Sequence, residues 1–153
     1  MMMIVRNAEY KDVLNSVKGR KVSVWTCSTC ARMCNGVGGQ QAAERLAIKL
    51  KEDGVDVKNS MSVSAACLMP KVNAKAEEMS KDIDVIISLT CDVGVTCAAR
   101  AFRKDVIAPL MTLGSGYIDE DGTLIVTSCH DAELPAPLNG VAEKKGMSVT
   151  PLA

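Results

Sequence analysis

The sequence predicts an α/β fold, a flavodoxin- or Rossmann-like three-layer arrangement with a mostly parallel sheet. Two observations carry this prediction. Segments typical of buried β-strands alternate with helical segments of about 10 to 15 residues along much of the chain. Aromatic residues make up only 3% of a chain that is 48% hydrophobic, so the core must be built from aliphatic and methionine side chains. A sheet covered by helices suits such a core.

The first half of the chain alternates strand and helix. Residues 21–26 alternate at a period of two and are rich in β-branched side chains, which predicts the first central strand. Gly38 and Gly39 then break the chain, and residues 41–53 carry apolar side chains at helical spacing before Gly54, a typical helix stop. The other elements expected here are a short leading segment, a helix over about 8–17, a strand over 55–65 and a helix over 70–81.

The second half continues this alternation and then becomes less regular. Residues 83–89 form the clearest buried strand, and a helix over about 94–103 follows. Residues 106–113 predict another strand, which Pro109 interrupts in the manner of an edge or a strand end. We expect residues 114–116 to turn the chain. A hairpin-like turn at residues 121–122 should precede a strand over 123–127, and an irregular tail should begin at about 130 within a single domain spanning 1–153.

The charge balance argues against a nucleic-acid partner. Eighteen basic residues match eighteen acidic ones, and the basic residues form no cluster that would bind a phosphate backbone. One Trp, two Tyr and one Phe are too few to stack successive bases. The N-terminal segment lacks the apolar stretch of a signal peptide, and no membrane-spanning run is present. We therefore expect a cytoplasmic protein with no membrane partner.

The seven cysteines are the main chemical signal in the chain. A reducing compartment does not maintain a disulfide framework, and an odd number of cysteines cannot all pair within one chain. Metal binding or redox chemistry is therefore the leading explanation. No Ser-His-Asp set or paired-acid spacing emerges, so we assign no catalytic residue.

Most of these cysteines follow predicted strands. Because the carboxyl ends of parallel strands meet at one edge of a sheet, we expect at least five thiols to converge on a single crevice. The cysteines placed directly after a strand are Cys27, Cys67, Cys91 and Cys129. Cys30 and Cys34 share a loop with the first of these, and Cys97 lies in the helix that follows the third.

The spacing of the cysteines favours an iron–sulfur cluster. Burial as a single inert thiol explains any one cysteine, Cys97 in particular, but not a CxxCxxxC loop with polar neighbours. Zinc ribbons use two separated CxxC pairs, whereas this chain has one compact trio and isolated single cysteines. We predict a 4Fe–4S cluster, with zinc as the alternative metal, and with Cys91 able to replace one of the four ligands. The predicted ligands are Cys27, Cys30, Cys34 and Cys67.

Two further features near the cysteines carry weaker signals. Residues 36–39 hold three glycines, which would let backbone amides approach a cluster, but they match a dinucleotide-binding GxGxxG motif poorly because the third glycine is missing. Cys91, Cys97 and Cys129 could ligate a second metal with His130, the only histidine. Adjacent residues in an extended chain point in opposite directions, so a solvent-facing His130 is the favoured interpretation.

The stretches VWTCSTCARMC, SAAC and LTCDVGVTCAARAF resemble the MetV-type small subunit of methylenetetrahydrofolate reductase, which also occurs as a fused C-terminal domain. Members combine an early CxxCxxxC loop, a lone cysteine after the second strand, and a strand ending in a cysteine followed by a Gly-Val turn. The resemblance covers about residues 20 to 129. It implies bound iron–sulfur clusters, sometimes with zinc, and a flavin-containing (β/α)8 barrel reductase subunit as partner.

The same resemblance implies an electron relay rather than a catalyst in one-carbon metabolism. A (β/α)8 barrel needs about 250 residues, so hydride chemistry on the folate would belong to the partner. The family's tail is usually rich in cysteine, whereas here residues 137–140 run into Val141 without a thiol. This departure puts a second cluster in doubt, and a shortened member could serve a corrinoid or methyl-transfer system instead.

Three other functions stay open at this point. The first is a zinc-stabilised structural or adaptor domain of a methyl-transfer complex with no redox role. The second is a cluster-bearing subunit of another redox complex, similar to the small subunits of hydrogenases or quinone reductases. The third is a thiol–disulfide oxidoreductase that uses Cys27 and Cys30 without a metal.

Overall fold

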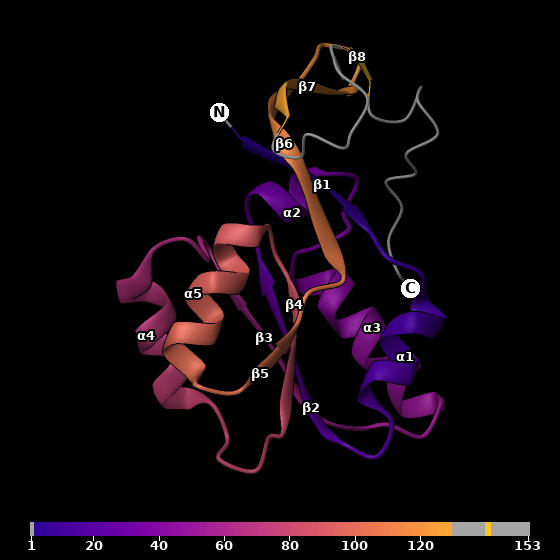
Figure 1. Ribbon diagram of the computed structural model, residues 1–153, viewed down its shortest axis with the longest axis vertical. Helices are drawn as coiled ribbons and strands as arrows, with labels where there is room; N and C mark the ends of the chain where they lie inside the picture. Colours follow the sequence, from indigo (N-terminus) through magenta and orange to yellow (C-terminus); the bar gives the residue numbers. More distant parts are fainter. Residues whose placement is uncertain (1, 130–139, 142–153) are drawn as a thin grey trace.

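A parallel β-sheet flanked by helices forms the centre of the protein (Figure 1). The computed structural model describes residues 2–129 and 140–141. The sheet has four strands in the order β3-β2-β4-β5, and every neighbouring pair is parallel. Its strands are β2 (Lys21–Cys27), β3 (Asp56–Val63), β4 (Val85–Leu89) and β5 (Asp105–Ile107). The predicted α/β class is confirmed, and the arrangement is compatible with a Rossmann-like fold.

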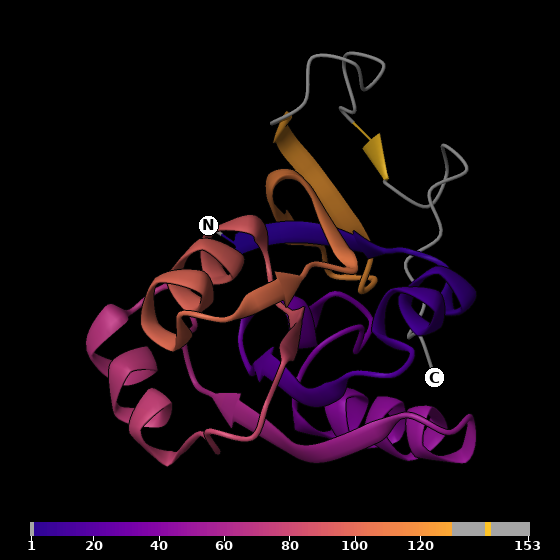
Figure 2. The same cartoon turned by 60° about the horizontal axis from the view of Figure 1, so that its bottom comes forward.

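Helices cover both faces of this sheet (Figure 2). The helices are α1 (Tyr10–Val17), α2 (Cys30–Met33), α3 (Gln40–Glu52), α4 (Met69–Glu78) and α5 (Asp92–Phe102). Side chains from α1 and α3 share one hydrophobic cluster with Val24 and Ile87, whereas side chains from α4 and α5 share a second cluster with Trp25 and Ile86. Successive residues of a strand thus enter opposite cores, as the period of two requires.

A second, antiparallel sheet departs from the sequence prediction. Its order is β1-β6-β7-β8, formed by β1 (Met2–Asn7), β6 (Leu110–Ile118), β7 (Leu124–Cys129) and β8 (Gly140–Val141). The strand predicted over 106–113 is divided at Pro109, because a proline cannot donate a ladder hydrogen bond. Its first part is β5 of the parallel sheet, and its second part continues as β6 of the antiparallel sheet.

The turn predicted at residues 114–116 is wrong. These residues lie inside β6, and the register of the β6–β7 pair shifts between Ser115 and Gly116. A Cβ atom at Gly114 would overlap the carbonyl oxygen of Ser128, and one at Gly116 would overlap that of Ile125. The glycines therefore permit a close approach of two strands.

The remaining predicted elements are present, with small differences at their ends. The helices expected over 8–17, 41–53, 70–81 and 94–103 correspond to α1, α3, α4 and α5. The turn at residues 121–122 is confirmed, with Gly122 at a φ of 79° and its N–H bonded to the carbonyl oxygen of Asp119. Most of the tail predicted from about 130 lies outside the described residues.

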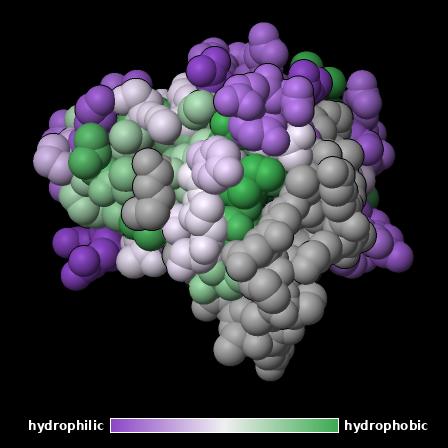
Figure 3. Space-filling view, turned by 90° about the horizontal axis from the view of Figure 1, so that it is seen from above, coloured by the Kyte–Doolittle hydropathy of each residue, from purple (hydrophilic) through white to green (hydrophobic). Residues whose placement is uncertain are grey.

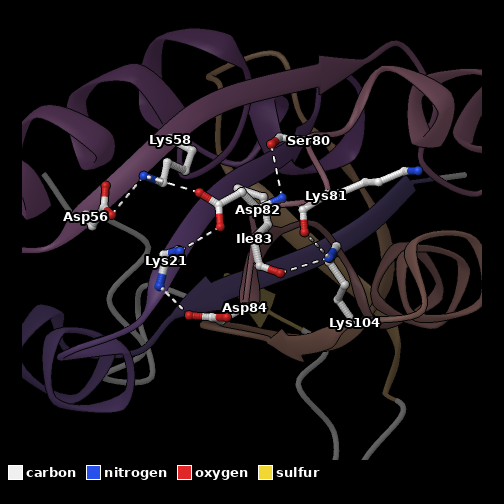
Figure 4. A network of polar contacts seen from close by, with 9 residues as sticks. All are labelled: Lys21, Asp56, Lys58, Ser80, Lys81, Asp82, Ile83, Asp84 and Lys104. Atoms are coloured by element: carbon white, nitrogen blue, oxygen red, sulfur yellow. Dashed lines mark hydrogen bonds and ion pairs between the residues drawn. The ribbon is translucent and has the colours of Figure 1, made fainter.

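Ion pairs join the amino-terminal ends of the parallel strands (Figure 4). The Lys21 ammonium lies 2.6 Å from the Asp82 carboxylate, and Lys58 contacts both Asp82 and Asp56. The hydrogen bond from Lys21 holds the pKa of Asp82 below its usual range. The backbone N–H of Lys21 also donates to Asp84 over 2.9 Å. Because these pairs are exposed, each contributes little to stability, but together they secure the edge opposite the cysteines.

Gly94 in α5 allows a test of helix packing near the cysteines. Helix propensity alone predicts that Gly94→Ala raises the free energy of unfolding by about 1 kcal/mol. However, a Cβ atom there would lie 2.6 Å from the Thr90 Cβ and 3.1 Å from the Ala66 Cβ. We therefore expect Gly94→Ala to lower the free energy of unfolding, measured by urea denaturation, by roughly 1–3 kcal/mol. Ala99→Gly, at an exposed position of the same helix, measures the propensity term alone, and a stabilised Gly94→Ala variant would contradict the packing.

Candidate metal centre

The cysteine-bearing loops meet where the strand order of the parallel sheet reverses. The chain leaves β2 for β3 on one side and returns to β4 on the other side of β2. The helix after β2 packs on one face and the helix after β4 on the opposite face, the arrangement that in open α/β sheets forms a ligand-binding crevice between the two strand ends. The loop 28–39 and the residues that follow β4 lie at this crevice. These two segments carry Cys30, Cys34 and Cys91 at the carboxyl edge of the sheet.

Thr26 holds the two strand ends together. This side chain is fully buried, and its hydroxyl donates a hydrogen bond of 3.1 Å to the Leu89 carbonyl oxygen. The Thr26 hydroxyl oxygen in turn accepts a bond of 2.7 Å from the backbone N–H of Gly39, at the start of α3. One hydroxyl therefore links β2, β4 and the end of the cysteine loop.

The loop after β2 folds into a single helical turn, α2. The N–H of Cys34 bonds to the carbonyl oxygen of Cys30 over 3.1 Å, so the two cysteines lie one turn apart on the same side of α2. A Cβ atom at Gly38 would lie 2.5 Å from the Ala31 Cβ and 3.0 Å from the Leu89 carbonyl oxygen. Gly38 is thus required for the loop to pack against β4. The sequence analysis related the glycines of residues 36–39 to the binding of a cluster and did not predict that Gly38 packs against β4.

The structure brings Cys91 to the Cys30–Cys34 pair. Cys34 is fully buried, and Cys30 and Cys91 are half-buried. Burial raises the pKa of Cys34 to about 11, a bond from the Val5 N–H opposes this rise, and the charges of Cys30 and Cys91 add to it. Burial likewise raises the pKa of Cys91, against hydrogen bonds from the N–H groups of Gly94 and Val93, and Cys30 again adds to the rise. The three thiols therefore share one electrostatic environment.

Cys27, the last residue of β2, and Cys67 instead lie at the loop that follows the neighbouring strand β3. Cys27 belongs to the core cluster of α4 and α5, and its Sγ accepts a bond of 3.4 Å from the Ala66 N–H. Cys67 follows in the same loop and is exposed. Cys97 is buried in the cluster that contains Cys27. Of the four predicted ligands, two therefore join Cys91, and the other two gather at the loop after β3.

Cys129 does not follow the predicted geometry. It ends β7, which belongs to the antiparallel sheet, and it pairs with Gly114 there. The expectation that its strand delivers it to the parallel carboxyl edge is therefore wrong. Its side chain is exposed, and His130 lies outside the described residues.

The three adjacent thiols match a soft metal in chemistry but are not arranged around a common point. Within residues 2–129 and 140–141, no group of three or more His, Cys, Asp or Glu side chains is set at metal-binding geometry. Thiolates are the preferred ligands of zinc and of iron–sulfur clusters. Ligation here would require the thiols to lose their protons and to turn toward one another.

A cleft of about 580 Å³ adjoins the cysteine loop and was not anticipated from the sequence. Its lining includes Arg32, Arg45 and the first turn of α3. The Arg32 Nε donates to the carbonyl oxygen of Ser28 over 3.1 Å, which anchors that side chain within the loop. The sequence did not predict this cleft because its two arginines lie in separate elements, thirteen positions apart, and form no periodic pattern.

Comparisons with protein-family models, curated proteins and solved structures found no match to this chain. No helix in the described ranges combines the length and the apolar character needed to cross a membrane.

The hydroxyl of Thr26 provides a stability test of the crevice. We expect Thr26→Val to lower the free energy of unfolding by about 1–3 kcal/mol. The Gly39 N–H and the Leu89 carbonyl oxygen would each lose their hydrogen bond to the Thr26 hydroxyl. Thr26→Ser keeps the hydroxyl and serves as the matched control. Urea denaturation of both variants gives the comparison, and a Val variant as stable as the Ser variant would argue against the role of the hydroxyl.

The raised pKa of Cys34 predicts a loss of stability at alkaline pH in metal-free protein. The unfolded thiol loses its proton near pH 9, while the folded one keeps it until about pH 11. Between these values the unfolded state binds fewer protons, so the free energy of unfolding falls as pH rises. We expect this fall to be roughly 1–3 kcal/mol larger in the wild type than in Cys34→Ser. Parallel pH curves for the two proteins would contradict it.

Proposed function

We propose that this chain is an iron–sulfur electron-relay subunit that partners a flavin-dependent methylenetetrahydrofolate reductase. The observation that carries the proposal is the meeting of Cys30 and Cys34 with Cys91 at the crevice between β2 and β4. This crevice is where open parallel sheets bind their ligands. The flavodoxin-like assignment of the sheet and the resemblance in the CxxCxxxC loop and the Cys91-Asp-Val-Gly94 turn support the same family role.

Cys30, Cys34 and Cys91 are the proposed inner ligands, and Cys27 or Cys67 is the fourth. A 4Fe–4S cluster bound there would transfer electrons one at a time. The chain's own contribution is a set of backbone donors and, around Cys34, complete burial. The N–H of Val5 reaches Cys34, and those of Val93 and Gly94 reach Cys91. Such donors stabilise thiolates, and hydrogen bonds to sulfur are one determinant of reduction potential.

The partner would dock at the carboxyl end of the sheet. Figure 3 looks onto this end of the molecule and shows hydrophobic surface among polar residues. Met33, Leu68 and Val93 follow the ends of three neighbouring strands, and between 44% and 48% of the surface of each is exposed. Exposed apolar side chains on neighbouring loops favour a protein partner, and we propose the flavin-containing barrel subunit of a cytoplasmic enzyme. Other redox or corrinoid subunits are the alternatives for the same surface.

A zinc-binding adaptor domain is the second candidate function. A single zinc ion needs four thiolates and no inorganic sulfide, so it occupies less space than a cubane cluster. The complete burial of Cys34 favours a small metal at this crowded position. A cluster-bearing subunit of another redox complex would use the same ligands with a different partner.

Metal analysis of cysteine variants tests the proposal. After anaerobic purification we expect stoichiometric iron and sulfide in the wild type, and loss of most of both in Cys30→Ser and Cys91→Ser, because each removes one ligand. Cys97→Ala is the matched control, since it removes a buried thiol from the opposite core cluster. Cys27→Ser and Cys67→Ser identify the fourth ligand.

Each other result has a defined meaning. Stoichiometric zinc without iron or sulfide, lost in the same variants, would replace the relay with the adaptor function. Iron content that is unchanged in Cys91→Ser would remove Cys91 from the site. Co-purification with a flavoprotein other than a barrel reductase would assign the chain to a different redox complex.

A further inference from the structure

The cleft beside the cysteine loop has a chemistry of its own. Its volume of about 580 Å³ lies within the usual range for a small-molecule pocket. The loop after β2 contributes Ser28, Arg32 and glycines to its lining, and α3 contributes Gln41, Glu44 and Arg45. Among the described residues that line it, none is a cysteine. The cleft is therefore a candidate binding site separate from the thiols.

Two contacts position Arg32 at the cleft. Its Nε donates a hydrogen bond of 3.1 Å to the Ser28 carbonyl oxygen. Its aliphatic stem lies across Gly39, where a Cβ atom would come within 2.8 Å of the Arg32 Cγ. Within the described ranges, the two terminal amino groups of the guanidinium have no hydrogen-bond or ion-pair partner. The side chain is thus anchored by its stem and its Nε, and its terminal donors are left for a ligand.

Arg45 is the second unpaired cation of the cleft. Glu44 is the one carboxylate among the described lining residues, and it accepts a bond of 2.9 Å from the Gln40 side-chain amide. Neither Arg45 nor Arg32 forms an ion pair with it or with another acid in the part of the chain that the structure describes. Two guanidinium groups from separate elements therefore border the cleft against a single opposing charge, which favours an anionic ligand.

The type of cation favours a phosphate group. A guanidinium presents paired donors that match two oxygens of a phosphate, and two guanidinium groups balance the charge of a phosphate dianion. The positive end of α3 reinforces this field, because the helix begins with no side-chain cap and no acidic residue in its first turn.

The remaining lining favours a sugar over a nucleobase. A phosphate group alone would leave most of the cleft empty, so the ligand carries an organic part as well. The described lining residues include no aromatic ring on which a base could stack. Ser28 and Gln41 instead bring a hydroxyl and an amide to the cleft, groups that can donate and accept hydrogen bonds with sugar hydroxyls.

We propose that this cleft binds a sugar phosphate, with Arg32 and Arg45 holding the phosphate and with Ser28 and Gln41 bonding to the sugar hydroxyls. The binding is reversible and makes no covalent bond. It goes beyond the proposed function and does not depend on it, because no thiol and no metal takes part.

Isothermal titration of the full chain at low ionic strength tests the site, with ribose 5-phosphate as the probe. We expect saturable binding to the wild type and none of ribose, which lacks the phosphate. Arg45→Gln should weaken binding by at least about 10-fold, because charge-assisted hydrogen bonds are lost. Glu44→Gln should tighten it by about 2- to 5-fold, because the opposing charge is removed. Arg100→Gln, at an exposed position of α5 outside the cleft, should match the wild type.

Several results would overturn the proposal. Equal affinity in the wild type and Arg45→Gln would exclude the arginine from the site, and equal affinity for ribose would exclude the phosphate. Inorganic phosphate that binds as tightly as ribose 5-phosphate would refute the role of the sugar, and tighter binding of AMP would replace the sugar phosphate with a nucleotide. Arg32→Gln is a second variant, and Arg45→Gln decides if loss of the loop anchor prevents folding.

The same preparations separate this site from the metal centre. A chain that lacks iron and zinc but binds ribose 5-phosphate would refute the proposed function and leave the sugar-phosphate site standing. A chain with a full complement of iron and sulfide that does not bind ribose 5-phosphate would refute the site and leave the electron relay standing.

Discussion

The reversal of strand order between β2 and β4 is the constraint on which the candidate site depends. Both strands end at the same edge, and the helices that follow them pack on opposite faces, so the chain cannot fill the space between the strand ends with a helix. The Thr26 hydroxyl and the missing side chain of Gly38 draw the loop after β2 against β4. Cys30 and Cys34 meet Cys91 because of this approach, which depends on backbone topology.

The sequence predicted the parallel part of the fold because that part obeys local rules. Residues 21–26 alternate at a period of two, and Gly54 ends a helix with a regular apolar face, so each element could be assigned without its neighbours. The antiparallel sheet has no such local signal. Residues 2–7 are a short apolar run whose partner is not adjacent in sequence, and Gly114 and Gly116 have the composition of a turn although they serve a close strand crossing.

The sequence predicted which cysteines follow parallel strands, but it did not predict which face of the sheet each side chain enters. Three cysteines do follow parallel strands, as the pattern predicted. Which core a thiol enters depends on a shift of one residue, and Cys27 ends β2 on the face of α4 and α5, away from the face of Cys34. Sequence spacing alone therefore favoured Cys67 over Cys91, whereas the contact between loops favours Cys91.

The pairing of β1 with β6 also determines the order in which the fold can be completed. β1 is synthesised well before its hydrogen-bonding partners, which lie more than a hundred positions later, where Arg6 contacts Met111 at a separation of 105 residues. Contacts this distant close late, because the entropy of the long loop must be overcome before they form. The parallel sheet and its cysteine loop can therefore form before β1 is paired, and the antiparallel sheet is then completed last.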